Sequence, residues 1–144
     1  MKFSDLDREE WNRLAPYLDT CLLPVTGLDG TEEPWKAKEA LEALRDALEL
    51  VEIPFKGRVV TYPAFHYAGP DLRSLLGDVC RKLKGAGFRH VIVLTASARA
   101  DIGDCPGADL VLRLVPEEGR HVRELAGDVS RLVRGLWNPP EPVP

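Results

Sequence analysis

One histidine, flanked by two aromatic residues, is the side chain in this sequence best suited to acid–base chemistry. His66 lies between Phe65 and Tyr67, directly after a run of β-forming residues. An imidazole titrates near neutral pH and can therefore donate or accept a proton under physiological conditions. The sequence offers no evident partner for it, so a packed structural histidine is the alternative interpretation.

Further polar side chains follow other predicted strands. Asp29 lies in a turn-rich loop, and Ser97 and Arg99 lie in a longer polar loop. Because the carboxyl ends of parallel strands meet at one edge of a sheet, we expect these groups to gather there. We predict a ligand-binding site made of Asp29, His66, Tyr67, Ser97, Arg99 and Asp101. Polar turns and helix caps are the alternative interpretation of the same residues.

No motif for a cofactor or a metal ion stands out. The glycines of residues 26–33 match neither a dinucleotide fingerprint nor a Walker loop, and the three carboxylates there would repel phosphate. Histidines, cysteines and carboxylates lack the paired spacing of a metal site. We therefore predict no catalytic residue, no metal and no cofactor.

The three cysteines are an odd number without paired spacing, which predicts reduced thiols. Cys21 and Cys80 occupy apolar positions and are expected to pack in the core. Cys105 lies in the polar loop and is expected to be exposed. The carboxylates of Asp101 and Asp104 would raise its pKa and make it a poor nucleophile.

Length and composition predict one packed domain over residues 1–137 and a proline-rich tail over residues 138–144. The chain has 144 residues, of which 44% are hydrophobic and 29% charged. No apolar stretch approaches the roughly 20 residues that span a bilayer, and the N-terminus is acidic, so we expect a cytoplasmic protein. The net charge of -4 argues against nucleic-acid and anionic-membrane surfaces.

The pattern of apolar residues predicts alternating helices and strands. Helices are expected at 4–15, at 35–51, after Pro70 and at 118–137, and strands at 17–25, 59–62, 90–95 and 109–115. The segment from Arg58 to Ser97 reads as strand, crossover helix and strand, which favours a parallel sheet. We predict an α/β fold, a three-layer αβα sandwich with a mainly parallel sheet of about four strands in the order 2-1-3-4. The direction of the fourth strand stays open.

Short apolar blocks at 17–24, 55–59, 63–65 and 87–91 resemble the uncharacterised YpiF-like proteins of Bacillus and related Firmicutes. They occur in the same order over roughly the first two-thirds of the chain. The resemblance implies a small cytoplasmic protein of unknown function.

Residues 23–27, the pair Tyr62-Pro63 and residues 87–93 are similar, more distantly, to the scaffold of creatininase-type metal-dependent amidohydrolases. That family places Glu and His after the first strand and a His-Gly-Gly-Asn turn after a later one. This chain has Asp29 without the histidine, and residues 95–99 read Thr-Ala-Ser-Ala-Arg. The resemblance implies a related scaffold that lacks the metal ligands.

The missing motifs favour a non-catalytic protein that binds a protein partner or a small ligand. The alternative is a small-molecule hydrolase that uses His66 with Asp29 or Asp101 at the carboxyl edge of the sheet. A homodimer is a further possibility, because Trp11, Trp35 and Trp137 lie near predicted helix ends and aromatic residues are enriched in interfaces.

Overall fold

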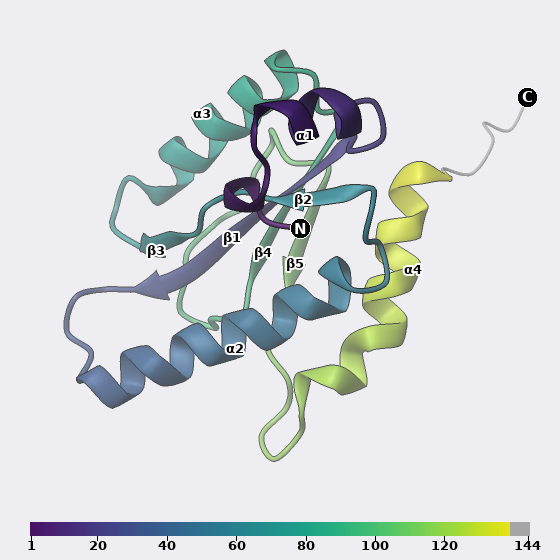
Figure 1. Ribbon diagram of the computed structural model, residues 1–144. Helices are drawn as coiled ribbons and strands as arrows, with labels where there is room; N and C mark the ends of the chain where they lie inside the picture. Colours follow the sequence, from purple (N-terminus) through teal and green to yellow (C-terminus); the bar gives the residue numbers. More distant parts are fainter. Residues whose placement is uncertain (139–144) are drawn as a thin grey trace, which may run out of the picture.

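The structure, a computed structural model, describes residues 1–138. Its strands are β1 (Thr20–Leu28), β2 (Val59–Thr61), β3 (Phe65–Tyr67), β4 (His90–Thr95) and β5 (Leu110–Arg113). Its helices are α1 (Arg8–Leu14), α2 (Pro34–Glu52), α3 (Leu72–Gly85) and α4 (Ala126–Trp137), with short 3₁₀ turns η1 (Phe3–Asp5) and η2 (Val122–Leu125). The strands form one sheet in the order β2-β1-β4-β5, and β3 pairs with the far end of β1 (Figure 1). Every pairing is parallel.

The central strand β1 contains a proline that the sheet accommodates. The ladder from β2 ends where Leu22 pairs with Thr61, and the ladder from β3 begins where Val25 pairs with Phe65. Leu22 directs its carbonyl oxygen toward this side of the strand, where it accepts the N–H of Tyr62. Alternate residues face the same side, so Pro24 faces the gap between the two ladders, where a missing N–H costs no hydrogen bond.

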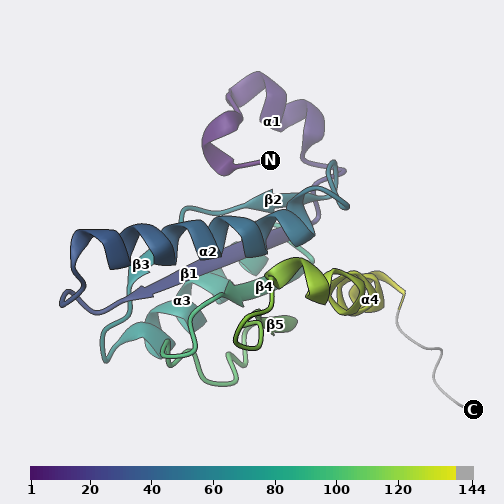
Figure 2. The same cartoon turned by 90° about the horizontal axis from the view of Figure 1, so that it is seen from below.

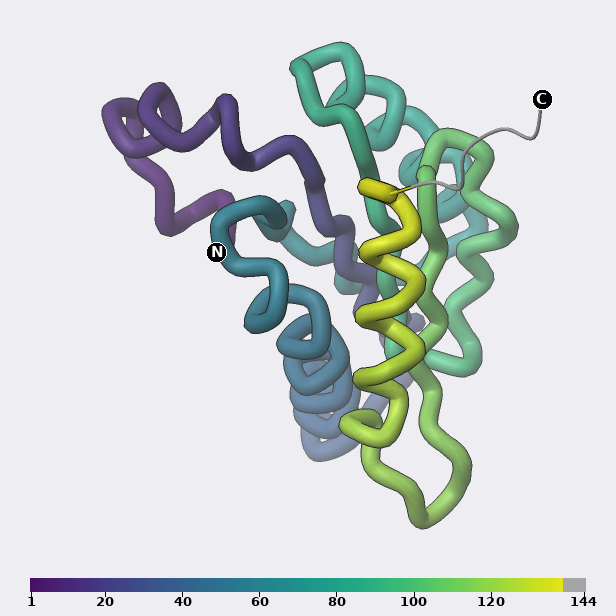
Figure 3. The backbone as a smooth tube through the Cα atoms, turned by 90° about the vertical axis from the view of Figure 1, so that its right-hand side faces the viewer, coloured from purple at the N-terminus to yellow at the C-terminus, as the bar shows by residue number. Residues whose placement is uncertain are grey.

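Helices cover both faces of the sheet, which gives three layers. Leu22 and Ile92 point toward α2 and α4, whereas Leu23 and Val93 point toward α3. Successive residues of a strand face opposite sides, so an uninterrupted apolar strand such as β4 needs cover on both. Figure 3 shows this arrangement edge-on, with α2 and α3 on either side of the sheet.

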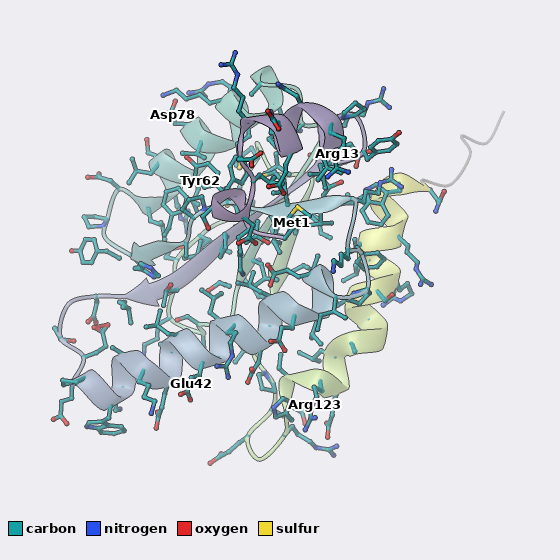
Figure 4. The ribbon with its side chains drawn as sticks, in the orientation of Figure 1. Met1, Arg13, Glu42, Tyr62, Asp78 and Arg123 are labelled. Atoms are coloured by element: carbon teal, nitrogen blue, oxygen red, sulfur yellow. The ribbon has the colours of Figure 1, made fainter. Side chains whose placement is uncertain are left out.

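The N-terminal segment covers the edge strand β2. The N–H of Thr61 donates to the carbonyl of Met1 at 2.8 Å, and Phe3 packs edge-on against Tyr62. Figure 4 places Met1 and Tyr62 beside the first 3₁₀ turn, and Figure 2 shows α1 lying outside β2. Pairing of this kind removes exposed N–H and C=O groups from a sheet edge.

The predicted fold class and strand order are confirmed. The fourth predicted strand, β5, runs parallel to β4. It is reached by an irregular crossover over residues 96–109 instead of a helix, and Ile102 and Cys105 of that crossover pack into the core on the α3 side. The short strand β3, where the sequence suggested only the end of strand two, is an addition.

Two helix starts differ from the prediction. The first α-helix begins at Arg8, because Asp7 and not Ser4 caps it by accepting the N–H of Glu10. The last begins at Ala126, after the 3₁₀ turn that His121 caps. Residues 139–144 of the predicted tail lie outside the described residues. No helix within residues 1–138 is long and apolar enough to cross a membrane.

Candidate functional site

A groove lies where the order of the strands reverses. From β1 the chain passes through α2 to β2, and from β3 it returns through α3, on the opposite face, to β4. The segment after β4 packs on the α3 face through Ile102 and Cys105, so the loops after β1 and β4 leave the sheet toward opposite faces. Ligands of open parallel sheets bind in the crevice between such loops. A hollow of about 530 Å³ occupies this place. We call it the switch-point groove. The start of α2 and the end of β1 mark it in Figure 1.

A β-bulge shapes the end of β1 that lines the groove. Val25 pairs with Phe65 and Leu28 pairs with Tyr67, so two residues of β1 stand opposite one residue of β3. Gly27, in the bulge, has a φ of 88°. A Cβ atom at this position would lie 2.8 Å from the Cβ of Ser97. Glycine thus permits both the left-handed backbone and the close approach of β1 to the loop after β4.

The bulge also brings Thr26 against His66. The hydroxyl of Thr26 and Nδ1 of His66 are hydrogen-bonded at 2.8 Å. Thr26 is buried and lines the groove, whereas His66 is exposed and lies outside the lining. A hydroxyl can donate to a neutral imidazole nitrogen or accept from a protonated one, so this bond holds β3 on β1 in either state.

The three carboxylates that line the groove are held by donors of their own loop and of the first turn of α2. Glu32 accepts the backbone N–H groups of Asp29, at 2.5 Å, and of Gly30, at 3.1 Å. Asp29 accepts the N–H and the hydroxyl of Thr31, and these bonds lower the pKa of the Asp29 carboxyl. Glu33 accepts the indole N–H of Trp35. These neutral donors hold the three carboxylates in place, and the negative charge of the carboxylates stays in the groove.

Across the groove, the loop after β4 presents hydrogen-bond donors. The hydroxyl of Thr95 donates to the carbonyl of Val25 and accepts the N–H of Ser97, which fixes the strand tips to each other. Oγ of Ser97 in turn accepts the N–H groups of Arg99 and Ala100, both at 3.2 Å. The hydroxyl proton of Ser97 is thus directed away from this turn.

The floor and the rim of the groove differ in character. We call the small residues of the lining the floor; they are Gly27, Ala40, Ala43, Ala68 and Ala96. The rim carries Trp35, Lys36 and Arg99, and the Lys36 ammonium lies 5.4 Å from the centroid of the Trp35 ring. The site combines small residues with cationic and aromatic groups.

The structure brings three of the six predicted site residues together in this groove: Asp29, Ser97 and Arg99. His66 is connected to it only through Thr26. Tyr67 is exposed and lies against Gly69, and Asp101 forms an ion pair with Arg73. Thr26, Lys36 and Trp35 also line the groove, although none of them is among the predicted site residues. The sequence position of Trp35 and Lys36 could have indicated their place in the groove, because both lie at the start of the helix that directly follows the loop after β1.

A second hollow, of about 730 Å³, lies between α2 and α4. It is lined by residues such as Leu50, Ile53, His121 and Arg123, and by none of the predicted site residues. Within residues 1–138, no three His, Cys, Asp or Glu side chains are grouped so that they could hold a metal ion.

The expectation of an exposed Cys105 is wrong. Only 4% of this residue is exposed, because the crossover folds back onto α3, and the thiol donates to the carbonyl of Ile102 at 2.9 Å. The pKa of Cys105 is raised mainly by burial, with a smaller contribution from Asp104. Asp101, paired with Arg73, is not among the causes.

Comparison with known proteins places the chain in a family. No curated protein and no solved structure matches it. Residues 9–101 match the family model described as "Protein of unknown function (DUF2487)". The matched range extends from α1 to the loop after β4, so it includes the residues that form the switch-point groove. The chain belongs to the DUF2487 family of proteins of unknown function.

Proposed function

We propose that this protein binds a small polar ligand in the switch-point groove and performs no chemistry on it. The observation that carries the proposal is a groove of about 530 Å³ at the reversal of strand order, with Ser97 and Arg99 facing loop carboxylates that are already hydrogen-bonded. A hollow of this size is typical of small-molecule sites. Position, size and donor chemistry all support binding.

The arrangement of ionisable groups favours binding over catalysis. A general base needs an orienting partner and access to the reacting atom. His66 directs Nδ1 to Thr26, whose side chain is buried. The two carboxylates proposed as its partners are engaged elsewhere, Asp29 with Thr31 and Asp101 with Arg73. The hydrolase alternative, with its creatininase-type scaffold, would require these groups to rearrange.

Turnover assays on His66→Ala test the hydrolase alternative. We expect purified protein to hydrolyse small amides and esters no faster than the buffer, and the variant to behave identically. Reproducible turnover by the natural sequence that disappears in His66→Ala would overturn the non-catalytic proposal.

Three finer points stay proposals. The blocks that resemble YpiF-like proteins of Bacillus and related Firmicutes all fall within the matched residues 9–101, which supports that affiliation. A cytoplasmic location is supported by the odd, unpaired set of cysteines. The alternative to a small ligand is a protein partner, or a second copy of the chain, that binds to the surface of this protein.

A screen for binding by nuclear magnetic resonance tests the proposed function. Fragments of acidic, basic and neutral character are added to ¹⁵N-labelled protein, and shifts are followed at the amides of Ser97 and Arg99 and at the indole N–H of Trp35. We expect at least one chemical class to shift these three signals together and saturably. Binders that shift only residues between α2 and α4, or no binder in any class, would refute the groove as the ligand site.

A further inference from the structure

We propose that the ligand of the switch-point groove is a small monocarboxylate with a flat apolar body, an inference that rests on the binding function proposed for the same groove. The charged head lies between Arg99, Ser97 and Lys36. The body lies on the floor of small residues and against Trp35. Each half follows from separate contacts.

The two cations of the groove, Arg99 and Lys36, are the groups that would bind an anion. Among residues 1–138, neither Arg99 nor Lys36 makes an ion pair. By contrast, Asp29 and Glu32 accept hydrogen bonds from their own loop, and Glu33 accepts one from Trp35 of α2. These hydrogen bonds occupy part of the acceptor capacity of the three carboxylates. An anionic ligand finds two cations whose charge is still available.

The neutral donors agree with this choice. Oγ of Ser97 already accepts two backbone N–H groups, so its remaining strong interaction is donation of the hydroxyl proton. Arg99 can only donate, and the same holds for Lys36. A group that accepts from all three sides, such as a carboxylate, satisfies them without leaving a donor unpaired.

The acidic loop limits the charge of the head to one. Three carboxylates line the groove opposite Arg99, and the Arg99 guanidinium is close enough to Asp29 to contribute to its lowered pKa. A phosphate dianion would be repelled by these carboxylates about twice as strongly as a carboxylate monoanion, because the Coulomb energy scales with the product of the charges. The mixed charge of the groove therefore favours a monocarboxylate over a phosphate.

The floor and rim determine the body. Ala40, Ala43 and Ala96 present methyl groups without polar atoms, and Gly27 presents only backbone. Trp35 is 54% exposed although it is the largest apolar side chain on the rim. Aromatic rings stack in offset or edge-on geometry over such surfaces, and Trp supplies much contact area at a small entropic cost. A flat apolar body could cover both the small residues of the floor and the ring of Trp35.

A matched series of probes tests the proposed class. The probes are 3-phenylpropionate, 3-phenylpropanol, 3-phenylpropylamine and 3-phenylpropyl phosphate, which share the body and differ in the head. Each is titrated into the full ¹⁵N-labelled chain, with the Ser97 and Arg99 amides and the Trp35 indole as reporters. We expect the carboxylate to bind at least tenfold more tightly than the other three probes.

Variants separate the head from the body. Arg99→Gln should weaken the carboxylate at least tenfold, and Trp35→Leu should weaken all four probes to a similar degree. Lys38→Gln is the control, because Lys38 lies on the same helix, outside the groove, and pairs with Glu42. Tighter binding of the amine or phosphate at the same reporters would overturn the carboxylate class and leave the proposed function standing. Absence of any shift at the reporters with all four probes would also overturn the class, and the broader fragment screen then decides the function independently.

Discussion

At the scale of single residues, the approach of Gly27 to Ser97 determines the shape of the groove. The backbone of Gly27 has a φ of 88°, and a Cβ there would lie 2.8 Å from Cβ and 2.9 Å from Oγ of Ser97. Two separate penalties therefore act against any side chain at this position. One is the left-handed backbone and the other is the collision with the loop after β4.

We predict that Gly27→Ala lowers the free energy of unfolding by about 2–4 kcal/mol, since both penalties apply. Gly30→Ala is the matched control. Its φ is 93°, yet nothing lies within 4 Å of the added Cβ, so only the backbone penalty of about 1–2 kcal/mol applies. Urea unfolding measures both. Equal losses in the two variants would show that the contact with Ser97 does not constrain the fold.

Residue pairs far apart in the sequence were the part of the site that sequence analysis could not find. Thr26 and His66 are 40 residues apart, and their hydrogen bond depends on a bulge that no local pattern announces. Asp29, Ser97 and Arg99 could be predicted as site residues because each follows a strand of a parallel sheet. The sequence could predict that a residue follows a strand, but it could not predict the direction in which the side chain points.

At the scale of elements, a polar cluster at the amino end of the sheet fixes α4 to β1 and β2. Arg58 donates to both carboxylate oxygens of Asp19, at 3.0 and 3.1 Å, and its guanidinium lies 4.1 Å from the centroid of the Trp137 ring. The Trp137 indole donates to the hydroxyl of Thr20 at 2.9 Å. One ion pair therefore connects two strands and the last turn of the last helix.

We predict that Asp19→Asn destabilises the protein at neutral pH and does so less in acid. Burial alone would raise the pKa of Asp19, but hydrogen bonds from Arg58 and Thr20 outweigh it, and the pKa is lowered. A carboxyl whose pKa is lower in the folded than in the unfolded chain, where it is about 3.9, stabilises the fold above that value. This contribution disappears as the pH falls through the folded pKa.

Urea unfolding at pH 7 and at pH 3 measures the effect. The expected loss at pH 7 is about 1.5–3 kcal/mol, the range for hydrogen bonds to charged groups, and it should shrink at pH 3. Asp128→Asn is the control, because Asp128 pairs with Arg131 on the exposed face of α4, where ion pairs contribute little. A loss of the same size at both pH values would mean that the charge of Asp19 is not what stabilises the cluster.

Helices and strands could be predicted where apolar residues recur along the sequence with the periodicity of a helix or a strand. The strand over 90–95 was predicted with its observed bounds. A strand that is covered on both faces needs an uninterrupted apolar run, and such a run is visible in the sequence. Within the irregular crossover, residues 96–107 were predicted as a polar loop, yet Ile102 and Cys105 are buried. Its burial depends on contacts with α3 and has no period, so the sequence pattern could not indicate it.

At the scale of the whole molecule, the three cysteines share one core on the α3 side of the sheet. Cys21 and Cys80 are fully buried and Cys105 nearly so. Burial raises the pKa of Cys21 to about 12 and that of Cys80 to about 11. The thiolate is the reactive form of cysteine, so the fold suppresses the reaction of these thiols both by covering them and by keeping them protonated.

The thiols should consequently report global unfolding. We predict that at pH 8 an aromatic disulfide reagent modifies all three cysteines at one slow rate in the native protein and rapidly in urea. The pKa of a cysteine in an unfolded chain is about 8.5. Above that pH the unfolded chain releases its thiol protons, whereas the folded chain retains them. The free energy of unfolding should therefore fall as the pH rises. Mass spectrometry after limited labelling identifies the modified residue. Rapid native labelling of Cys105 alone would show that the crossover opens independently of the sheet, and would separate its stability from that of the core it covers.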